Sequence, residues 1–264
     1  MNRKICISVG NTELDRIYAD IDYAKTVNAG FVELRFDTIK ETKETQDVDE
    51  FHRTPVFEKI EKIISYGKAL GIKIIGTKRG AGFGPGRNIS SLKEIACEEF
   101  QRIKFLKYLI EAGIYACDIE LDIVRRPAVK DFTVYAHDMG SKVILSVHDF
   151  SKQIDLMSTV RFYIDAHYFG ADCFKLADVV ISDKDVTAVL EKNQTVQSIR
   201  AAAPVSFPAF TIFGMGEKGT ATRILSLIYG SEMAYCSSQS GATAPGQVSA
   251  EEFYAMMNFA EVQF

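Results

Sequence analysis

The sequence predicts a single (β/α)8 barrel over residues 1–264, and three observations indicate this fold. Eight short apolar runs rich in β-branched residues recur along the chain, helical patterns separate them, and glycines stand where helices give way to strands. Eight alternations of strand and helix in roughly 250 residues are typical of this barrel, whose functional groups gather at the carboxyl ends of the strands. A doubly wound open sheet is the competing architecture.

The expected strands are apolar runs that lie, in chain order, at 4–9, 31–36, 73–77, 117–121, 142–148, 172–176, 207–213 and 233–237. Apolar side chains at helical spacing predict helices at 56–70 and 91–112, the second opened by a capping box of Ser91 and Glu94. The charged segment 40–50 predicts a solvated loop or a frayed helix start. Residues that tolerate positive φ end helices, and the junction glycines are Gly30, Gly71, Gly113, Gly170 and Gly230.

The composition favours a cytoplasmic protein. A net charge of −4 argues against a nucleic-acid partner, which would need a clustered basic face. Five cysteines without framework spacing are typical of a reducing compartment, and four of them fall in apolar runs: Cys6, Cys117, Cys173 and Cys236. No apolar stretch reaches the ~18 residues of a spanning helix, and the run after 1–4 is too short for a signal peptide. We expect no membrane partner, and a homodimer as the commonest assembly of such enzymes.

Lys175 is the most informative residue because it interrupts the apolar run 172–177. A buried ammonium must be paired, neutralised or used. Desolvation disfavours the charged form, and the free amine is the species that attacks a carbonyl carbon to form a Schiff base. The alternative is a lysine that snorkels from the strand end to solvent.

Polar residues at alternate positions of three other expected strands accompany Lys175. Alternate side chains point to one face of a strand, and the polar sets are Glu33, Arg35 and Asp37; Asp118 and Glu120; and Ser146 and His148. Because strand ends meet in a barrel, these groups predict one pocket. A Glu33–Arg35 ion pair that only fills the barrel is the alternative, although such pairs rarely improve stability over apolar packing.

Three segments rich in glycine or small residues follow expected strands. The segment 214–219 matches G-x-G-x-x-G, but the next strand does not end in the acidic residue of a dinucleotide site, so we interpret it as a tight turn that leaves a phosphate site open. The segment 79–87 predicts a mobile loop at the barrel mouth, and the segment 237–247 predicts a lid over the substrate. No cluster of histidines, cysteines or carboxylates has metal-ligand spacing, so we expect no metal and no cofactor.

Six short motifs follow one another along nearly the whole chain: ELRFD at 33–37, DIEL at 118–121, SVHDF at 146–150, FKLA at 174–177, Met215 with Arg223, and TAPGQ at 243–247. The combination of HDF, FKLA and APGQ is much more specific than any one of them. In these motifs the chain resembles the type I 3-dehydroquinate dehydratases, the Schiff-base (β/α)8 barrels of the shikimate pathway. The resemblance implies dehydration of 3-dehydroquinate to 3-dehydroshikimate without a cofactor.

The resemblance also implies roles for individual residues. Lys175 would form the imine with the substrate ketone, and His148 would move protons. Arg223 would bind the substrate carboxylate. The further contacts that the resemblance implies, some by weaker matches, come from Glu33, Arg35, Gln247, Thr243, Arg79 and Ser8, while Met215 is more typical of packing than of recognition.

One departure from the family pattern concerns the orientation of His148. The family carries a glutamate after the third strand that helps to orient this histidine, and here the segment 82–84 has none. Asp118 and Glu120 are the candidates to substitute for it. A second departure is Thr243 in place of the lid serine of the family, which keeps the hydroxyl.

Two alternative functions stay open. The first is a Schiff-base aldolase for a phosphorylated sugar, with phosphate bound at 214–219. The second is a non-catalytic relative that binds a polyhydroxy acid, which the missing glutamate motivates.

Overall fold

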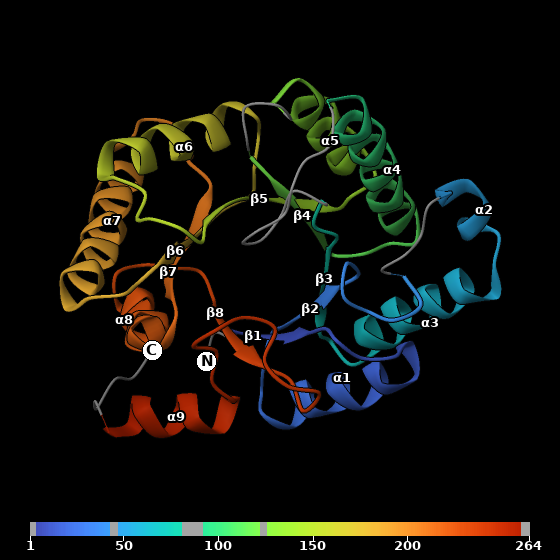
Figure 1. Ribbon diagram of the computed structural model, residues 1–264, viewed down its shortest axis with the longest axis horizontal. Helices are drawn as coiled ribbons and strands as arrows, with labels where there is room; N and C mark the ends of the chain where they lie inside the picture. The colour runs from blue at the N-terminus through green and yellow to red at the C-terminus, as the bar shows by residue number, and fades with distance from the viewer. Residues whose placement is uncertain (1–3, 43–46, 81–91, 122–125, 260–264) are drawn as a thin grey trace.

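Eight parallel strands form a barrel in the computed structural model of the chain, which describes residues 4–42, 47–80, 92–121 and 126–259. The strands are paired in the order β7-β6-β5-β4-β3-β2-β1-β8, and the helices lie outside them (Figure 1). Between β7 and the start of β8, the Glu232 amide donates to the Phe210 carbonyl oxygen at 2.6 Å. The predicted (β/α)8 barrel is therefore confirmed, and the open doubly wound sheet is wrong.

The strands have nearly the predicted limits, and they are β1 (Ile5–Val9), β2 (Phe31–Arg35), β3 (Lys73–Thr77), β4 (Ala116–Glu120), β5 (Lys142–Asp149), β6 (Cys173–Val179), β7 (Ala209–Met215) and β8 (Ala234–Ser237). The sixth and seventh strands extend three and two residues beyond their predicted ends. Asp178 and Gly214 interrupt the apolar runs there, but the parallel pairing continues through them to Val179 and Met215.

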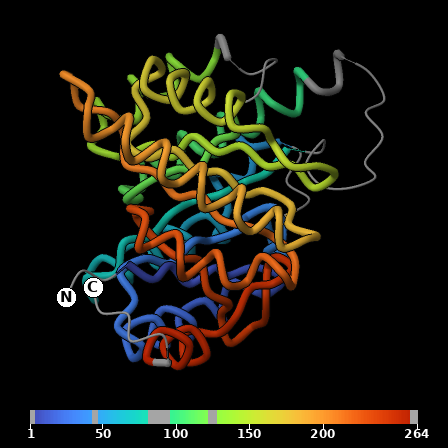
Figure 2. The backbone as a smooth tube through the Cα atoms, turned by 90° about the vertical axis from the view of Figure 1, so that its left-hand side faces the viewer, coloured from blue at the N-terminus to red at the C-terminus, as the bar shows by residue number. Residues whose placement is uncertain are grey.

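The helices of the described residues are α1 (Ile17–Thr26), α2 (Val48–His52), α3 (Pro55–Ala69), α4 (Leu92–Glu111), α5 (Arg126–Asp138), α6 (Leu156–Tyr168), α7 (Asp183–Ala202), α8 (Thr220–Ile228) and α9 (Ala250–Phe259). Figures 1 and 2 both place α9 beside α1, and the Tyr254 hydroxyl donates to the Val27 carbonyl oxygen at 3.0 Å. The last helix therefore packs against the first. None of the helices in the described part of the chain has the length and apolarity to span a bilayer.

Most junction glycines have the predicted backbone conformation. Gly71, Gly113, Gly170 and Gly230 have positive φ, but Gly30 does not. Asn28, with φ of 55°, takes that conformation after α1 instead, since asparagine tolerates the left-handed region better than most residues. The segment 40–50 holds the start of α2, whose N-cap Asp47 accepts from the Asp49 and Glu50 amides. The predicted capping box of Ser91 and Glu94 lies outside the described side chains.

Two apolar clusters explain where a site can form. The larger cluster lies between the strands and the helices. The smaller one is formed by inward-facing side chains, among them Phe31, Ile75 and Ile144, and it also contains Phe213 and Tyr235. Charged residues occupy the inward positions nearer the carboxyl ends of the strands. The barrel is thus packed in its lower part and polar at its upper end.

Candidate active site

A cavity of about 230 Å³ opens at the carboxyl end of the barrel. Ten of the twelve residues singled out in the sequence line it, namely Ser8, Glu33, Arg35, Arg79, His148, Lys175, Met215, Arg223, Thr243 and Gln247. The other two, Asp118 and Glu120, are buried next to Arg79. Side chains from far apart in the sequence therefore converge, as the barrel fold requires.

Lys175 projects from β6 into this cavity and is 3% exposed. Its Nζ lies 3.0 Å from Asp118 Oδ2 and 3.1 Å from Glu33 Oε1. It also lies 4.0 Å from the centroid of the Tyr235 ring. The alternative of a lysine that snorkels to solvent is wrong. The Lys175 side chain is thus buried and paired with two carboxylates, one of the outcomes expected for a buried lysine.

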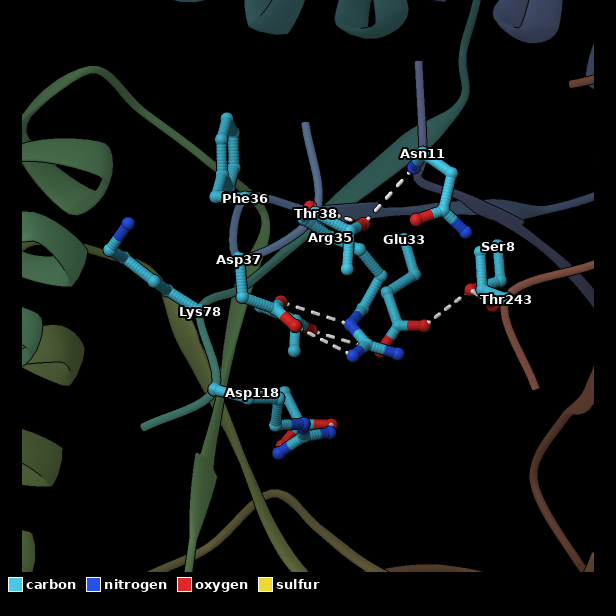
Figure 3. A network of polar contacts seen from close by, with 12 residues as sticks. Ser8, Asn11, Glu33, Arg35, Phe36, Asp37, Thr38, Lys78, Asp118 and Thr243 are labelled. Carbon is cyan, nitrogen blue, oxygen red and sulfur yellow. Dashed lines mark hydrogen bonds and ion pairs between the residues drawn. The ribbon is translucent and has the colours of Figure 1, made fainter. Parts of the chain in front are cut away.

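Glu33 links the amine to the segment after β8. Its Oε1 accepts from Lys175 and from the Thr77 hydroxyl at 2.9 Å, and its Oε2 accepts from the Ser8 hydroxyl at 2.7 Å. Figure 3 shows Ser8 between Glu33 and Thr243, and the two hydroxyl oxygens are 2.7 Å apart. Burial opposes the ionisation of Glu33, but Lys175 and Arg35 hold its pKa below the usual value.

The predicted lid residues continue this chain of hydrogen bonds. The Thr243 amide and hydroxyl donate to Gln247 Oε1 at 2.8 and 3.1 Å. Thr243, Ala244, Pro245 and Gln247 all line the cavity. The segment therefore covers part of the site, whereas its closing over a substrate stays a prediction.

Arg79 is held by carboxylates below the cavity. Its two terminal nitrogens lie 2.7 and 2.8 Å from the two Asp118 oxygens, and Nη1 also donates to Ser146 Oγ at 2.8 Å. Glu120 Oε1 lies 3.4 Å from the same nitrogen. Burial opposes the ionisation of Asp118, but Arg79 and Lys175 lower its pKa far below the usual value. Asp118 is therefore a fixed anion.

Arg102 on α4 completes the network, and the sequence analysis missed it. It is 2% exposed, and its Nη1 lies 2.6 Å from Glu120 Oε2. Glu120 is thus held between Arg102 and Arg79, as Asp118 is held between Arg79 and Lys175. These contacts engage both carboxylates that were candidates to orient His148, so their action on the histidine remains a prediction.

His148 lies at the end of β5 and lines the cavity. Burial lowers its pKa well below 6.5, and the neighbouring Arg79 and Lys175 lower it further against the opposing effect of Asp118. Its ring lies nearly parallel to that of Phe150, with centroids 6.4 Å apart. At neutral pH the side chain is therefore a neutral imidazole, which is the form that accepts a proton.

Arg35 is paired with Asp37 and not with Glu33 as the alternative reading of the sequence had it. Nε and Nη2 of Arg35 donate to the two Asp37 oxygens at 3.0 and 2.7 Å (Figure 3). Asp37 lies in the turn that follows β2, two residues beyond the end of the strand, so period-two alternation does not extend to it. This pair sets the guanidinium at the cavity wall.

Arg223 from α8 is a buried cation of a different kind. Among the residues that the structure describes, no carboxylate forms an ion pair with it, and its Nη1 and Nη2 approach only the carbonyl oxygens of Tyr235 at 3.5 Å and Pro245 at 3.3 Å. Its guanidinium lies 4.6 Å from the centroid of the Phe213 ring. Burial lowers its pKa to about 10. Such a site can accept an anion, and a planar guanidinium matches a carboxylate.

Replacing Arg223 with methionine should stabilise the protein, because it removes a buried cation that no carboxylate of the described residues pairs with. We expect the free energy of unfolding at pH 7 to rise by about 1–3 kcal/mol. Arg102→Met is the matched control, since it removes an equally buried arginine that does form ion pairs, with Glu120 and Glu99, and should cost about 3–5 kcal/mol. Chemical denaturation measures both. Equal losses in the two variants would contradict the interpretation of Arg223 as an unpaired cation.

The turn after β7 uses its backbone amides within the chain. The Gly214 amide donates to Thr222 Oγ1 at 2.7 Å, the Gly216 amide to the Pro245 carbonyl oxygen at 3.2 Å, and the Gly219 amide to Gly216 at 3.0 Å. A Cβ at Gly246 would lie 2.1 Å from the Gly216 oxygen, so the segment after β8 packs directly on this turn. The tight turn is confirmed, and these three amides are not open to a phosphate.

Two aromatic residues of the site escaped the sequence analysis. They are Phe213 on β7 and Tyr235 on β8, which both line the cavity and whose ring centroids are 5.6 Å apart. Alternation along β8 could have identified Tyr235, since Met233, Tyr235 and Ser237 share a face. The predicted loop at 79–87 lies, beyond Gly80, outside the described residues, as does 82–84. No group of three metal-binding side chains occurs in the part of the chain that the structure describes.

Comparison with known proteins links the whole barrel to one family. The family described as type I 3-dehydroquinase matches residues 5–263. The 3-dehydroquinate dehydratase of Methanocaldococcus jannaschii is 30% identical over 223 residues, which cover 83% of this chain and 82% of the relative. The 3-dehydroquinate dehydratase of Clostridium novyi is 26% identical over 257 residues, which cover 97% of this chain and 91% of the relative. The relatives are thus matched over most of their length.

Solved structures agree on the fold. The type I 3-dehydroquinate dehydratase of Clostridium difficile, solved with covalently modified comenic acid, has a TM-score of 0.77 at 23% identity and covers 98% of this chain and 92% of its own. The 3-dehydroquinate dehydratase of Geobacillus kaustophilus has a TM-score of 0.76 at 17% identity and covers 98% and 91%. A putative deoxyribose-phosphate aldolase from Coccidioides immitis has a TM-score of 0.55 at 11% identity and covers 89% and 81%.

Proposed function

Because this chain belongs to the type I 3-dehydroquinase family, we propose that it is a hydro-lyase that converts 3-dehydroquinate into 3-dehydroshikimate and water, in the shikimate pathway, through an imine on Lys175. The observation that carries the mechanism is the position of Lys175. Its amine is buried in a cavity that also holds a neutral histidine and an arginine for which the described side chains supply no ionic partner. A ketone, an acidic C–H bond and a carboxylate are the three features of the substrate that these groups suit.

The reaction begins with the loss of a proton from the Lys175 ammonium. Glu33 is the better acceptor, since Asp118 is fixed by two hydrogen bonds from Arg79. The free amine then attacks the ketone carbon. A C–N bond forms, the ketone oxygen takes one proton from the amine and one from Glu33 and leaves as water, and a cationic imine remains.

His148 carries the next two proton transfers in this proposal. The imine acidifies the adjacent C–H bond, and the neutral imidazole takes that proton to give an enamine. The resulting imidazolium then protonates the departing hydroxyl, which leaves as water, and the enamine becomes a conjugated imine. Addition of water to the cationic imine breaks the C–N bond, releases 3-dehydroshikimate and restores the Lys175 ammonium.

Binding of the substrate is assigned to the groups around Lys175. Arg223 receives the carboxylate, because it is the buried cation that lacks an ionic partner among the described side chains and its guanidinium can give two parallel hydrogen bonds. Arg35, Gln247, Thr243 and Ser8 offer donors and acceptors for the substrate hydroxyls. The phosphorylated-sugar alternative is disfavoured, since the turn after β7 uses its amides internally.

The decisive experiment is borohydride reduction in the presence of 3-dehydroquinate, followed by mass mapping of the peptides. We expect a covalent adduct on Lys175, and appearance of the conjugated product in the ultraviolet without borohydride. An adduct on another residue would refute the mechanism. Product formation without any adduct would refute the imine and leave the activity in place.

The pH dependence of turnover should reflect the lowered pKa of His148. A histidine whose pKa lies well below 6.5 stays neutral as the pH falls through that value, so kcat/KM should show no loss from this group between pH 7.5 and 6. The loss should come at lower pH, where the imidazole is finally protonated. A profile with its acid limb centred at pH 6.5 would contradict this expectation.

The homodimer and the cytoplasmic location belong to the same proposal, as does the absence of a nucleic-acid partner. Family membership supports a role in a biosynthetic pathway of small metabolites. Sedimentation equilibrium of the purified chain tests the dimer, and a sedimenting mass of about 29.4 kDa, that of one chain, would contradict it.

A further inference from the structure

Lys175 has an aromatic neighbour as well as two carboxylates. Its Nζ lies 4.0 Å from the centroid of the Tyr235 ring, and the ring is 3% exposed. A cation over the face of a desolvated aromatic ring is attracted by the quadrupole of the ring more strongly than at an exposed site. The contact joins β6 to β8, two strands that are not paired with one another.

The Tyr235 ring belongs to an aromatic floor shared by the two cations of the site. Its centroid lies 5.6 Å from that of Phe213, and Phe213 in turn lies 4.6 Å from the Arg223 guanidinium. The Tyr235 carbonyl oxygen accepts from Arg223 at 3.5 Å. Tyr235 therefore contacts both the amine proposed to bind the ketone and the guanidinium proposed to bind the carboxylate.

We propose that the Tyr235 ring is a catalytic group that stabilises the cationic forms of Lys175, namely the ammonium of the free enzyme and the imine cation of the covalent intermediate. The neutral amine and the neutral enamine gain much less from the ring. Tyr235 thereby favours the imine cation, the species that acidifies the adjacent C–H bond. For the imine cation this inference rests on the proposed function. For the ammonium of the free enzyme it rests on the structure alone.

The phenol group does not supply the attraction. Burial raises the pKa of Tyr235 well above its usual value, so the side chain carries no charge at neutral pH. The face of the ring is what Lys175 meets. Phenylalanine should therefore substitute for tyrosine in this role, whereas an aliphatic side chain of similar bulk should not.

The test measures the reactivity of Lys175 without the substrate. Trace labelling of the whole protein with isotope-coded acetic anhydride, followed by mass mapping, reports the fraction of free amine at each lysine as a function of pH. In Tyr235→Leu we expect the midpoint of the Lys175 labelling profile to fall by about one pH unit. In Tyr235→Phe the midpoint should stay within about 0.3 unit. A wider opening of the cavity would scale the labelling rate at all pH values but would not move the midpoint.

The same samples contain an internal control. Lys73 lies over the rings of Phe31 and Tyr115, at 5.0 and 4.9 Å from their centroids, and its labelling midpoint should be the same in all variants. If Tyr235→Leu does not fold, Tyr235→Met takes its place. Equal Lys175 midpoints in the aliphatic variant and the wild type would overturn the proposal, and so would equal shifts in the aliphatic and phenylalanine variants.

Failure of this inference can be told apart from failure of the proposed function. Borohydride trapping with 3-dehydroquinate tests the function in the wild type, whatever the labelling midpoints are. If both ideas hold, Tyr235→Leu should also accumulate about tenfold less trapped imine than Tyr235→Phe at equal substrate. A normal imine yield in Tyr235→Leu would mean that the ring stabilises only the ammonium of the free enzyme. That result would overturn the proposed catalytic role of Tyr235.

Discussion

Lys175→Met should lower the turnover of 3-dehydroquinate by about 10⁴-fold or more and abolish the borohydride adduct. Methionine keeps most of the bulk of the side chain but has no amine, so no C–N bond can form with the ketone. Loss of a covalent nucleophile costs rates on this scale in other enzymes. The measurement is the steady-state rate of product absorbance, together with mass mapping after reduction.

Stability needs a control of its own in this experiment, because Lys175→Met leaves Glu33 and Asp118 without their shared cation. Lys192→Met is the matched variant. Lys192 is 2% exposed against 3% for Lys175, pairs with Asp178, and donates to Gln153 Oε1 at 3.0 Å on the outer side of the barrel. Both variants should lose about 3–5 kcal/mol of stability. Substantial activity in folded Lys175→Met, or equal loss of activity in folded Lys192→Met, would refute the assignment of Lys175.

The sequence was informative about the barrel because its signals are periodic and local. Apolar runs fix the strands, and the ends of parallel strands in a barrel must meet, so Lys175, His148 and Glu33 could be brought to one cavity without coordinates. The limits of β6 and β7 were set too short for a related reason. Asp178 and Gly214 interrupt the apolar runs, while the backbone pairing continues through them to Val179 and Met215.

The partners of each charge could not be predicted in the same way. Alternation places Arg35 beside both Glu33 and Asp37, and only the side-chain geometry shows that Asp37 takes both hydrogen bonds. Arg102 is on a helix with no inward strand position to reveal it, and its contact with Glu120 depends on how α4 packs on β4. Pairings of this kind depend on tertiary packing, which the spacing of residues along the chain does not reveal.

The state of Lys175 is the clearest example of such a dependence. Burial alone argues for a neutral amine, whereas the two carboxylates and the Tyr235 ring argue for a cation. The mechanism therefore has to include removal of a proton from the ammonium. His148 is in the opposite situation, since burial and two neighbouring cations act together to keep it neutral.

His148→Ala should reduce kcat by about 10²–10⁴-fold while still allowing the imine to form. Alanine removes the group proposed to take the C–H proton, but it leaves the Lys175 amine and the Arg223 guanidinium in place. The first imine should therefore accumulate, and borohydride should trap a larger fraction of Lys175 than in the wild type at the same substrate concentration. Rapid quenching with borohydride during a single turnover measures both quantities.

A proton-transfer role can be separated from a structural one by chemical rescue. Removal of the ring leaves a space inside the cavity that free imidazole can enter, and added imidazole should restore part of the rate in His148→Ala. His137→Ala serves as the control, because His137 is exposed and pairs with Asp172 at the amino end of β6. Full activity in His148→Ala would remove this residue from the mechanism. Loss of the trapped imine in the same variant would mean that His148 acts before the C–H bond is broken, in the formation of the imine itself.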